Sequence, residues 1–111
     1  MNRHRGDMTA CLGGRERTLR LTFEGLAEIE SRLDAGIVAV AERFSRRSVG
    51  TAEVSAILDA ALKGGGEAMG EAALQSAIME LGFVEAARLA GRVLALGLGA
   101  EAGDGEAPGK P

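Results

Sequence analysis

The stretch RTLRLTFEGLAEIESRL, residues Arg17–Leu33, changes its hydrophobic period part of the way along, and the rest of the chain can be placed around that change. Its first part alternates polar and apolar side chains, which is typical of a half-buried β-strand. The apolar positions of this alternation are Leu19, Leu21 and Phe23. After Thr22 the apolar positions recur as on one face of an α-helix, at Leu26, Ile29 and Leu33. We therefore predict that a strand leads directly into a helix.

Three local features agree that this helix begins close to Thr22. The Thr22 hydroxyl can accept a hydrogen bond from a free amide of the first turn, as N-cap residues do. Glu24 places a negative charge near the positive end of the helix dipole. Leu21 and Leu26 occupy the positions of a hydrophobic staple, in which two apolar side chains pack across the start of a helix. This boundary is the best-specified point of the chain.

A second, weaker alternation of polar and apolar residues precedes this stretch at Asp7–Leu12. Between the two lies Gly13–Glu16, whose glycines can adopt the positive φ that a tight turn requires. We therefore predict a β-hairpin over residues 7–22, with strands near Asp7–Leu12 and Arg17–Thr22. Two strands alone are marginally stable in water, so helices should cover the apolar face of the hairpin. Residues 1–6 are polar and basic and are expected to be disordered.

Helical patterns follow along the rest of the chain. They predict five helices, at residues 23–33, 36–46, 52–63, 71–81 and 83–98. Asp34 and Thr51 are the candidate N-caps of the second and third helices, and Gly64–Gly66 should end the third. Residues 99–111 lack periodicity and are expected to form a disordered tail. The predicted fold class is α+β and predominantly helical: a single small domain over residues 7–98, in which an N-terminal hairpin is followed by a bundle of four to five short helices.

Length, charge and cysteine content narrow the class of protein. The 111 residues fit one domain of ordinary size, and the single cysteine, Cys11, suits a reducing cytoplasm. No apolar stretch follows Arg3 and Arg5, as a signal peptide requires, and the longest apolar stretch, Val93–Leu98, is too short to span a membrane. The net charge of −3 disfavours a general attraction to nucleic acid or anionic lipid. We expect a soluble cytoplasmic protein that does not bind membranes.

Residues that could carry out catalysis are sparse. His4 is the only histidine, and it lies in the segment expected to be disordered, whereas a general base must be held in place. Cys11 is better explained as a small half-buried or edge residue of a strand than as a nucleophile, because no ordered histidine is available to activate it. One histidine and one cysteine cannot assemble a nitrogen/sulfur metal site. Gly64–Gly66 lacks the preceding strand and the following Lys-Ser/Thr of a phosphate-binding loop. We expect no enzymatic activity, metal or cofactor.

Two clusters of charge have ordinary explanations. The acidic cluster consists of Glu24, Glu28 and Glu30. It would form a solvated face opposite the apolar stripe of its helix. The basic cluster consists of Arg43, Arg46 and Arg47. It could contact phosphate, but no recognition helix follows it and the chain is acidic overall, so nucleic-acid binding is disfavoured.

The end of the last predicted helix is apolar on all sides, which a surface helix should not be. The candidate partner-binding residues there are Val93, Leu94, Leu96 and Leu98. They could anchor this helix in a groove of another protein, or they could complete the core of the monomer. The variant Leu94→Glu distinguishes these roles. Loss of partner capture by a folded domain would indicate a binding surface, whereas loss of folding would indicate a core position.

The order of these features resembles a known family. A strand pair leads into TLRLTFEGLAEIESRL, which is followed by RFS and then by TAEVSAILDAALKGGG, a helix that closes on a glycine-rich stop. Over about residues 6–66 this order is similar to that of the small tail assembly chaperone proteins of gene transfer agents and related phage tail clusters. The resemblance implies a role in building a phage-like tail by binding the tape-measure protein or tail tube subunits, and it brings no catalytic residues.

The leading interpretation is a tail assembly chaperone of a gene transfer agent or prophage. Such a protein binds an aggregation-prone tail component during virion assembly and is absent from, or sparse in, the finished particle. One alternative is a structural tail component, a tube or connector subunit that self-associates or joins other subunits and stays in the particle. The other is a small nucleic-acid-binding regulator that uses the arginine cluster, which a steep salt dependence of DNA binding would support.

Overall fold

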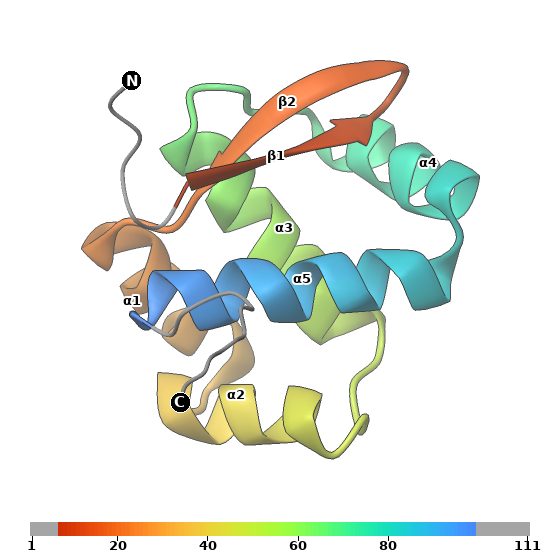
Figure 1. The fold of residues 1–111 in the computed structure, drawn as a ribbon. Helices are drawn as coiled ribbons and strands as arrows, with labels where there is room; N and C mark the ends of the chain where they lie inside the picture. Colours follow the sequence, from red (N-terminus) through yellow and green to blue (C-terminus); the bar gives the residue numbers. More distant parts are fainter. Residues whose placement is uncertain (1–6, 100–111) are drawn as a thin grey trace, which may run out of the picture.

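The computed structural model describes residues 7–99, which form a two-stranded antiparallel hairpin followed by five helices. The elements are β1 (Asp7–Leu12), β2 (Arg15–Arg20), α1 (Phe23–Leu33), α2 (Ile37–Ser45), α3 (Thr51–Gly64), α4 (Glu71–Leu81) and α5 (Phe83–Gly97). This α+β arrangement confirms the predicted fold class (Figure 1). The predicted terminal segments lie outside the described residues, except for Gly99.

The turn of the hairpin consists of two residues rather than the predicted four. Leu12 pairs with Arg15, and the glycines between them have φ of 64° and 90°, as the central residues of a type I′ turn require. The prediction that the turn spans Gly13–Glu16 and that the second strand begins at Arg17 is therefore wrong by two residues. Two adjacent glycines suffice for the reversal, so Arg15 and Glu16 are free to pair with β1.

The strand-to-helix boundary lies where the sequence predicts it. The Thr22 hydroxyl accepts a hydrogen bond from the amide of Gly25 at 3.0 Å, which confirms Thr22 as the N-cap of α1. Leu19 and Leu21 are buried, but Phe23 is 85% exposed. The prediction that Phe23 shares their face is wrong, because the chain has already entered the helix at Phe23 and a period of two no longer applies.

The connection between α1 and α2 departs from the sequence prediction. Asp34 has a φ of 52° and closes the C-terminus of α1, whereas the N-cap of α2 is Gly36. Gly36 has no side chain to accept from the first-turn amides. Instead, the carboxylate of Glu30 accepts a hydrogen bond from the amide of Ile37 at 2.8 Å. A residue of α1 thus takes the role that was predicted for Asp34.

The start of α3 also differs from the prediction, by one residue in the opposite direction. Its N-cap is Gly50, and Thr51, the predicted N-cap, is the first helical residue. The carboxylate of Glu53 accepts a hydrogen bond from the amide of Gly50 at 2.7 Å, which is one half of a capping box. Glu53 also accepts from the guanidinium of Arg43 at 3.0 Å, so the same carboxylate ties α3 to α2.

Helix α3 is the centre of the core. Seven of its residues are buried, and it packs against α1, α4, α5 and β2. Figure 1 shows the hairpin on one side of α3 and α2 on the other, with α5 crossing between them. Buried residues from every element form one cluster built from Leu, Ile, Val and Ala, with Met8, Phe44 and Phe83 among the partly buried residues around it.

The end of α3 lies directly against β2. A Cβ atom at Gly64 would overlap the carbonyl oxygen of Arg20, and one at Gly65 would overlap that of Thr18. Just beyond, the carboxylate of Glu67 accepts a hydrogen bond from the Thr18 amide at 3.2 Å. The glycines therefore end the helix, as predicted, and also allow its last turn to approach the strand backbone.

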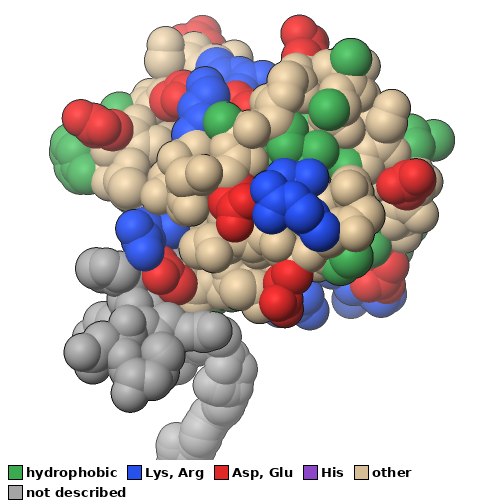
Figure 2. Space-filling model, turned by 90° about the horizontal axis from the view of Figure 1, so that it is seen from above, with side chains coloured by type: hydrophobic (Ala, Val, Ile, Leu, Met, Phe, Trp, Pro, Cys, Tyr) green, Lys and Arg blue, Asp and Glu red, His purple; other side chains and the backbone are tan. Residues whose placement is uncertain are grey.

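The surface carries charges of both signs. On the face seen in Figure 2, acidic and basic side chains are interspersed, and hydrophobic side chains form small separate groups. Over residues 7–99, none of the helices is long and apolar enough to cross a lipid bilayer.

Candidate functional site

The four predicted partner-binding residues do not form one exposed patch. Val93 and Leu94 are 0% and 1% exposed and belong to the core, which is the alternative left open by the sequence. Leu96 is half-buried and Leu98 is 39% exposed. A role of this helix end in partner binding stays a prediction, and Leu96 and Leu98 are the residues that a partner could reach.

A groove lies between α5 and α2, and Leu94 is the one of these four residues that lines it. Its volume is about 810 Å³. The apolar residues that line it are Ala41, Phe44, Val49, Phe83, Val84, Ala87, Gly91, Leu94 and Ala95. Gly91 contributes to the hollow because it has no side chain: a Cβ at this position would lie 3.5 Å from Cδ2 of the Phe44 ring. We call this feature the α2–α5 groove.

Three arginines also line the α2–α5 groove, namely Arg47, Arg88 and Arg92. Arg88 forms an ion pair with Glu85 at 2.6 Å, whereas Arg47 and Arg92 form none with any residue in the 7–99 range. Every residue that lines the groove is neutral or basic. The groove therefore combines an apolar floor with uncompensated positive charge.

The predicted cluster of Arg43, Arg46 and Arg47 is divided by the fold. Arg43 is held by Glu53, and Arg46 lies 3.9 Å from Glu42 on the exposed side of α2. Only Arg47 lines the groove. Arg47 has a φ of 59°, so the chain turns sharply there as it leaves α2. The cluster is not one basic patch, because the three side chains have different surroundings.

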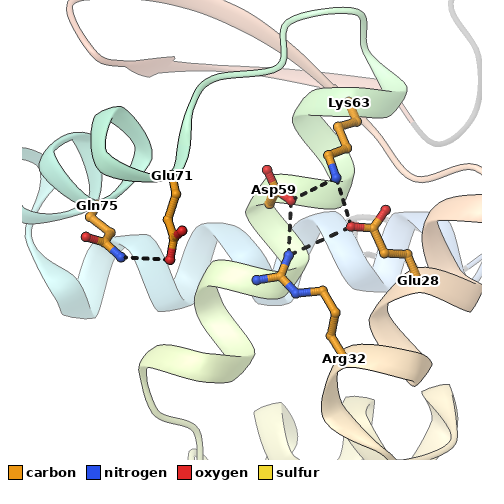
Figure 3. Close-up of polar contacts among 6 residues, drawn as sticks. All are labelled: Glu28, Arg32, Asp59, Lys63, Glu71 and Gln75. Atoms are coloured by element: carbon orange, nitrogen blue, oxygen red, sulfur yellow. Dashed lines mark hydrogen bonds and ion pairs between the residues drawn. The ribbon is translucent and has the colours of Figure 1, made fainter.

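A second, smaller cleft of about 410 Å³ lies where α1, α3 and α4 meet. Four of its charged residues form ion pairs with one another, whereas Glu71 accepts a hydrogen bond from Gln75. Figure 3 shows Lys63 between Glu28 and Asp59, at 3.0 and 3.3 Å, and Arg32 at 3.0 Å from Asp59. The hydrogen bonds to Glu28 and Asp59 raise the pKa of Lys63 above its ordinary value. Glu28 thus takes part in the ion pairs that connect α1 to α3. The prediction that it stands on a purely solvated acidic face is wrong.

The residues considered for catalysis are not brought together. His4 lies outside the described residues, and Cys11 is exposed on β1, as predicted for a residue at a strand edge. Glu24 is exposed, Glu28 forms an ion pair with Lys63 of α3, and Glu30 caps α2. Between residues 7 and 99, no three His, Cys, Asp or Glu residues are close enough together to hold a metal ion. The α2–α5 groove is therefore the candidate functional site, and it is suited to binding a protein.

The comparisons with known proteins agree with a tail protein. The model of a family of phage-like tail proteins matches residues 5–100. The family is described as phage tail tube protein, GTA-gp10, and since the match covers most of the chain, the chain belongs to this family. No curated protein and no solved structure matched.

Sequence reasoning did not find the α2–α5 groove. It singled out Arg47 and Leu94, which line the groove, but for other reasons. A further local signal is Gly91, a glycine in the middle of a helical pattern, which often has a packing or functional reason. Such a signal indicates a special position without indicating which element lies opposite. Arg47 and Arg92 are far apart in the sequence, and only the packing of α2 on α5 places both beside the same hollow.

Proposed function

We propose that this protein is a structural component of a phage-like tail, a tube or connector subunit that works through protein–protein contacts and catalyses no reaction. The family to which the chain belongs, described as a tail tube protein, supports this role. The α2–α5 groove is the observation that carries the proposal of a contact surface, because it offers an apolar floor and charge without catalytic groups.

The test is the composition of purified tail particles. Particles from cells that produce the complete chain would be analysed by quantitative mass spectrometry. We expect this protein at a constant ratio to the other tail subunits, at several copies per particle. Its absence, or a trace amount that varies between preparations, would contradict a structural role.

A tail assembly chaperone is the second candidate function. An open apolar groove with arginines that have no ion-pair partner among residues 7–99 would suit a protein that holds a tail component before assembly, in the cytoplasm where tails are built. Under this proposal an affinity-tagged chain would recover the tape-measure or tail tube protein from producing cells, while finished particles would lack it. Stoichiometric presence in particles would instead favour the structural role.

A further inference from the structure

We propose that the α2–α5 groove binds an amphipathic α-helix of another tail protein, with acidic residues flanking its apolar face. This inference rests on the proposed function, because it names the chemistry of the partner at the same site. It is supported by the helical walls of the groove, by the charge of its lining residues and by the composition of residues 100–111.

The walls favour a helical occupant. Most backbone amides and carbonyls along the groove are already hydrogen-bonded within α2 and α5, or at the end of α2, where the Arg47 amide donates to the Phe44 carbonyl at 3.1 Å. An extended peptide would lose hydrogen bonds to water there without finding replacements. A helix satisfies its own backbone and needs only apolar side chains to fill the hollow between Phe44 and Val84.

The charge favours acidic flanks. Arg47 and Arg92 have no carboxylate partner in the described part of the chain, and the Arg88–Glu85 pair is largely exposed, so Arg88 can exchange partners at little cost. Asp or Glu residues beside the apolar stripe of a bound helix would give these guanidinium groups hydrogen-bonded partners. A basic helix would meet only like charge at this groove.

The tail of the chain itself does not have the required composition. Residues 100–111 contain Glu101, Asp104 and Glu106 against one basic residue, Lys110, so their net negative charge would suit the groove. They contain no Leu, Ile, Val, Met or Phe, however, and so have no large apolar side chain to fill it. The occupant is therefore expected to come from another polypeptide.

The position of the occupant can be mapped by photo-crosslinking in cells that assemble tails. A photoreactive phenylalanine analogue would replace Val84, which lines the groove, or Val38, which is equally exposed on α2 but outside it. We expect the probe at position 84 to crosslink to one segment of another tail protein, whose sequence shows a helical apolar stripe with Asp or Glu beside it. The probe at position 38 should give little of this product, because a photoreactive group outside the groove does not contact the occupant.

Several outcomes would overturn the inference. These are crosslinks from position 84 to a second copy of this chain, to its own residues 100–111 or to a basic segment, and the absence of any crosslink specific to position 84. Each of them excludes an acidic helix of another tail protein as the occupant.

Charge variants provide the second measurement. A synthetic peptide of the crosslinked segment would be titrated against the wild-type chain and against Arg47→Gln/Arg92→Gln, with binding followed by fluorescence anisotropy. We expect the double variant to bind about tenfold more weakly, since each exposed ion pair contributes modestly. Arg46→Gln, a change at the neighbouring residue that does not line the groove, should leave affinity within about twofold on the same scale. Equal effects of both changes would contradict a specific role of the groove arginines.

The two proposals can fail separately. If the chain is stoichiometric in particles while the position-84 probe and the arginine variants behave as their controls, the protein is a tail component that does not use this groove. If the groove captures an acidic helix but the chain is neither in particles nor bound to tail proteins during assembly, the proposed function fails instead.

Discussion

Glu53 shows how a single carboxylate can connect local and tertiary structure. It accepts hydrogen bonds from the Gly50 amide at the start of α3 and from the guanidinium of Arg43 on α2. The hydrogen bond from Gly50 is the main cause that lowers the pKa of Glu53 below its ordinary value, and Arg43 lowers it further. The folded state therefore favours the ionised form of Glu53, which makes stability depend on pH.

The lowered pKa of Glu53 predicts how stability changes in acid. Its contribution is fully present above the pKa of glutamate in the unfolded chain, about 4.3, and is lost as the pH falls through the lower pKa of the folded state. Glu53→Gln should therefore be less stable than the wild type at pH 7, and the difference should shrink towards pH 3. Urea unfolding followed by circular dichroism across this range measures the effect.

A matched variant separates the two partners of Glu53. Arg43→Gln removes the guanidinium but keeps the hydrogen bond from Gly50, so its pH dependence should lie between those of the wild type and Glu53→Gln. If the stability difference between wild type and Glu53→Gln stays constant from pH 7 to pH 3, ionisation of Glu53 is not coupled to folding.

Leu94 and Leu98 lie one helical turn apart and should respond very differently to truncation. Leu94→Ala removes a side chain that is 1% exposed and should lower the free energy of unfolding by about 2–5 kcal/mol. Leu98→Ala changes a side chain that is 39% exposed and should lower it by less than about 1 kcal/mol. Chemical denaturation of both variants measures this, and Leu94→Glu should fail to fold. A folded Leu94→Glu protein would place Leu94 outside the core.

At the scale of whole elements, glycines decide how closely helices approach their neighbours. Gly64 lets the last turn of α3 lie against the carbonyl of Arg20, where no side chain has room. Gly91 lies in the middle of α5 beside the α2–α5 groove, where a methyl group would make ordinary contact with Phe44. The same residue type thus serves close packing at one position and leaves a hollow at the other.

Alanine at these two glycines should change stability in opposite directions. Gly64→Ala would force α3 away from β2 and should cost about 1–3 kcal/mol or more, as overpacking does. Gly91→Ala should raise stability by up to about 1 kcal/mol, because alanine favours the helix and the added methyl group meets no clash. Thermal unfolding of both variants gives the two signs, and destabilisation by Gly91→Ala would show that the groove does not have room for a methyl group.

At the scale of the whole molecule, the helices are not equally integrated. Helix α3 has seven buried residues and packs against four other elements, whereas Val40 is the buried residue of α2. Because α2 contributes one buried residue to the shared core, we expect it to open locally more readily than α3. We therefore expect α2 to be the more adaptable wall of the α2–α5 groove.

Native-state hydrogen exchange should reveal this difference. The amides of the buried part of α3, Val54–Leu62, should exchange only through global unfolding, while those of α2 should exchange at least about tenfold faster through local opening. Protection factors, which correct for the intrinsic rate of each amide, are the quantity to compare. Equal protection of α2 and α3 would mean that the molecule opens as one unit.

Sequence reasoning succeeded where the signals are local. The hydroxyl of Thr22 and the change of period after it mark the start of α1, because a cap and its amides lie within one turn of each other. The roles predicted for Asp34, Thr51 and Phe23 were wrong. Asp34 ends α1 instead of starting α2, Thr51 is the first residue of α3 instead of its N-cap, and Phe23 begins α1 instead of continuing the buried face of the strand. Whether a helix is capped by its own N-cap or by Glu30 from the preceding helix depends on how the two helices meet.

The sequence by itself determined the order of elements, the places where α1 and α4 begin and end, and an apolar set large enough for one core. Only the tertiary structure decided that Leu94 is buried, that Gly64 contacts β2 and that Arg47 and Arg92 line the same groove. The physical reason is the separation along the chain over which each kind of interaction acts. Hydrogen bonds and side-chain periodicity act within a turn or a strand pair, whereas grooves and core positions arise from residues far apart in the chain that meet only when the helices pack.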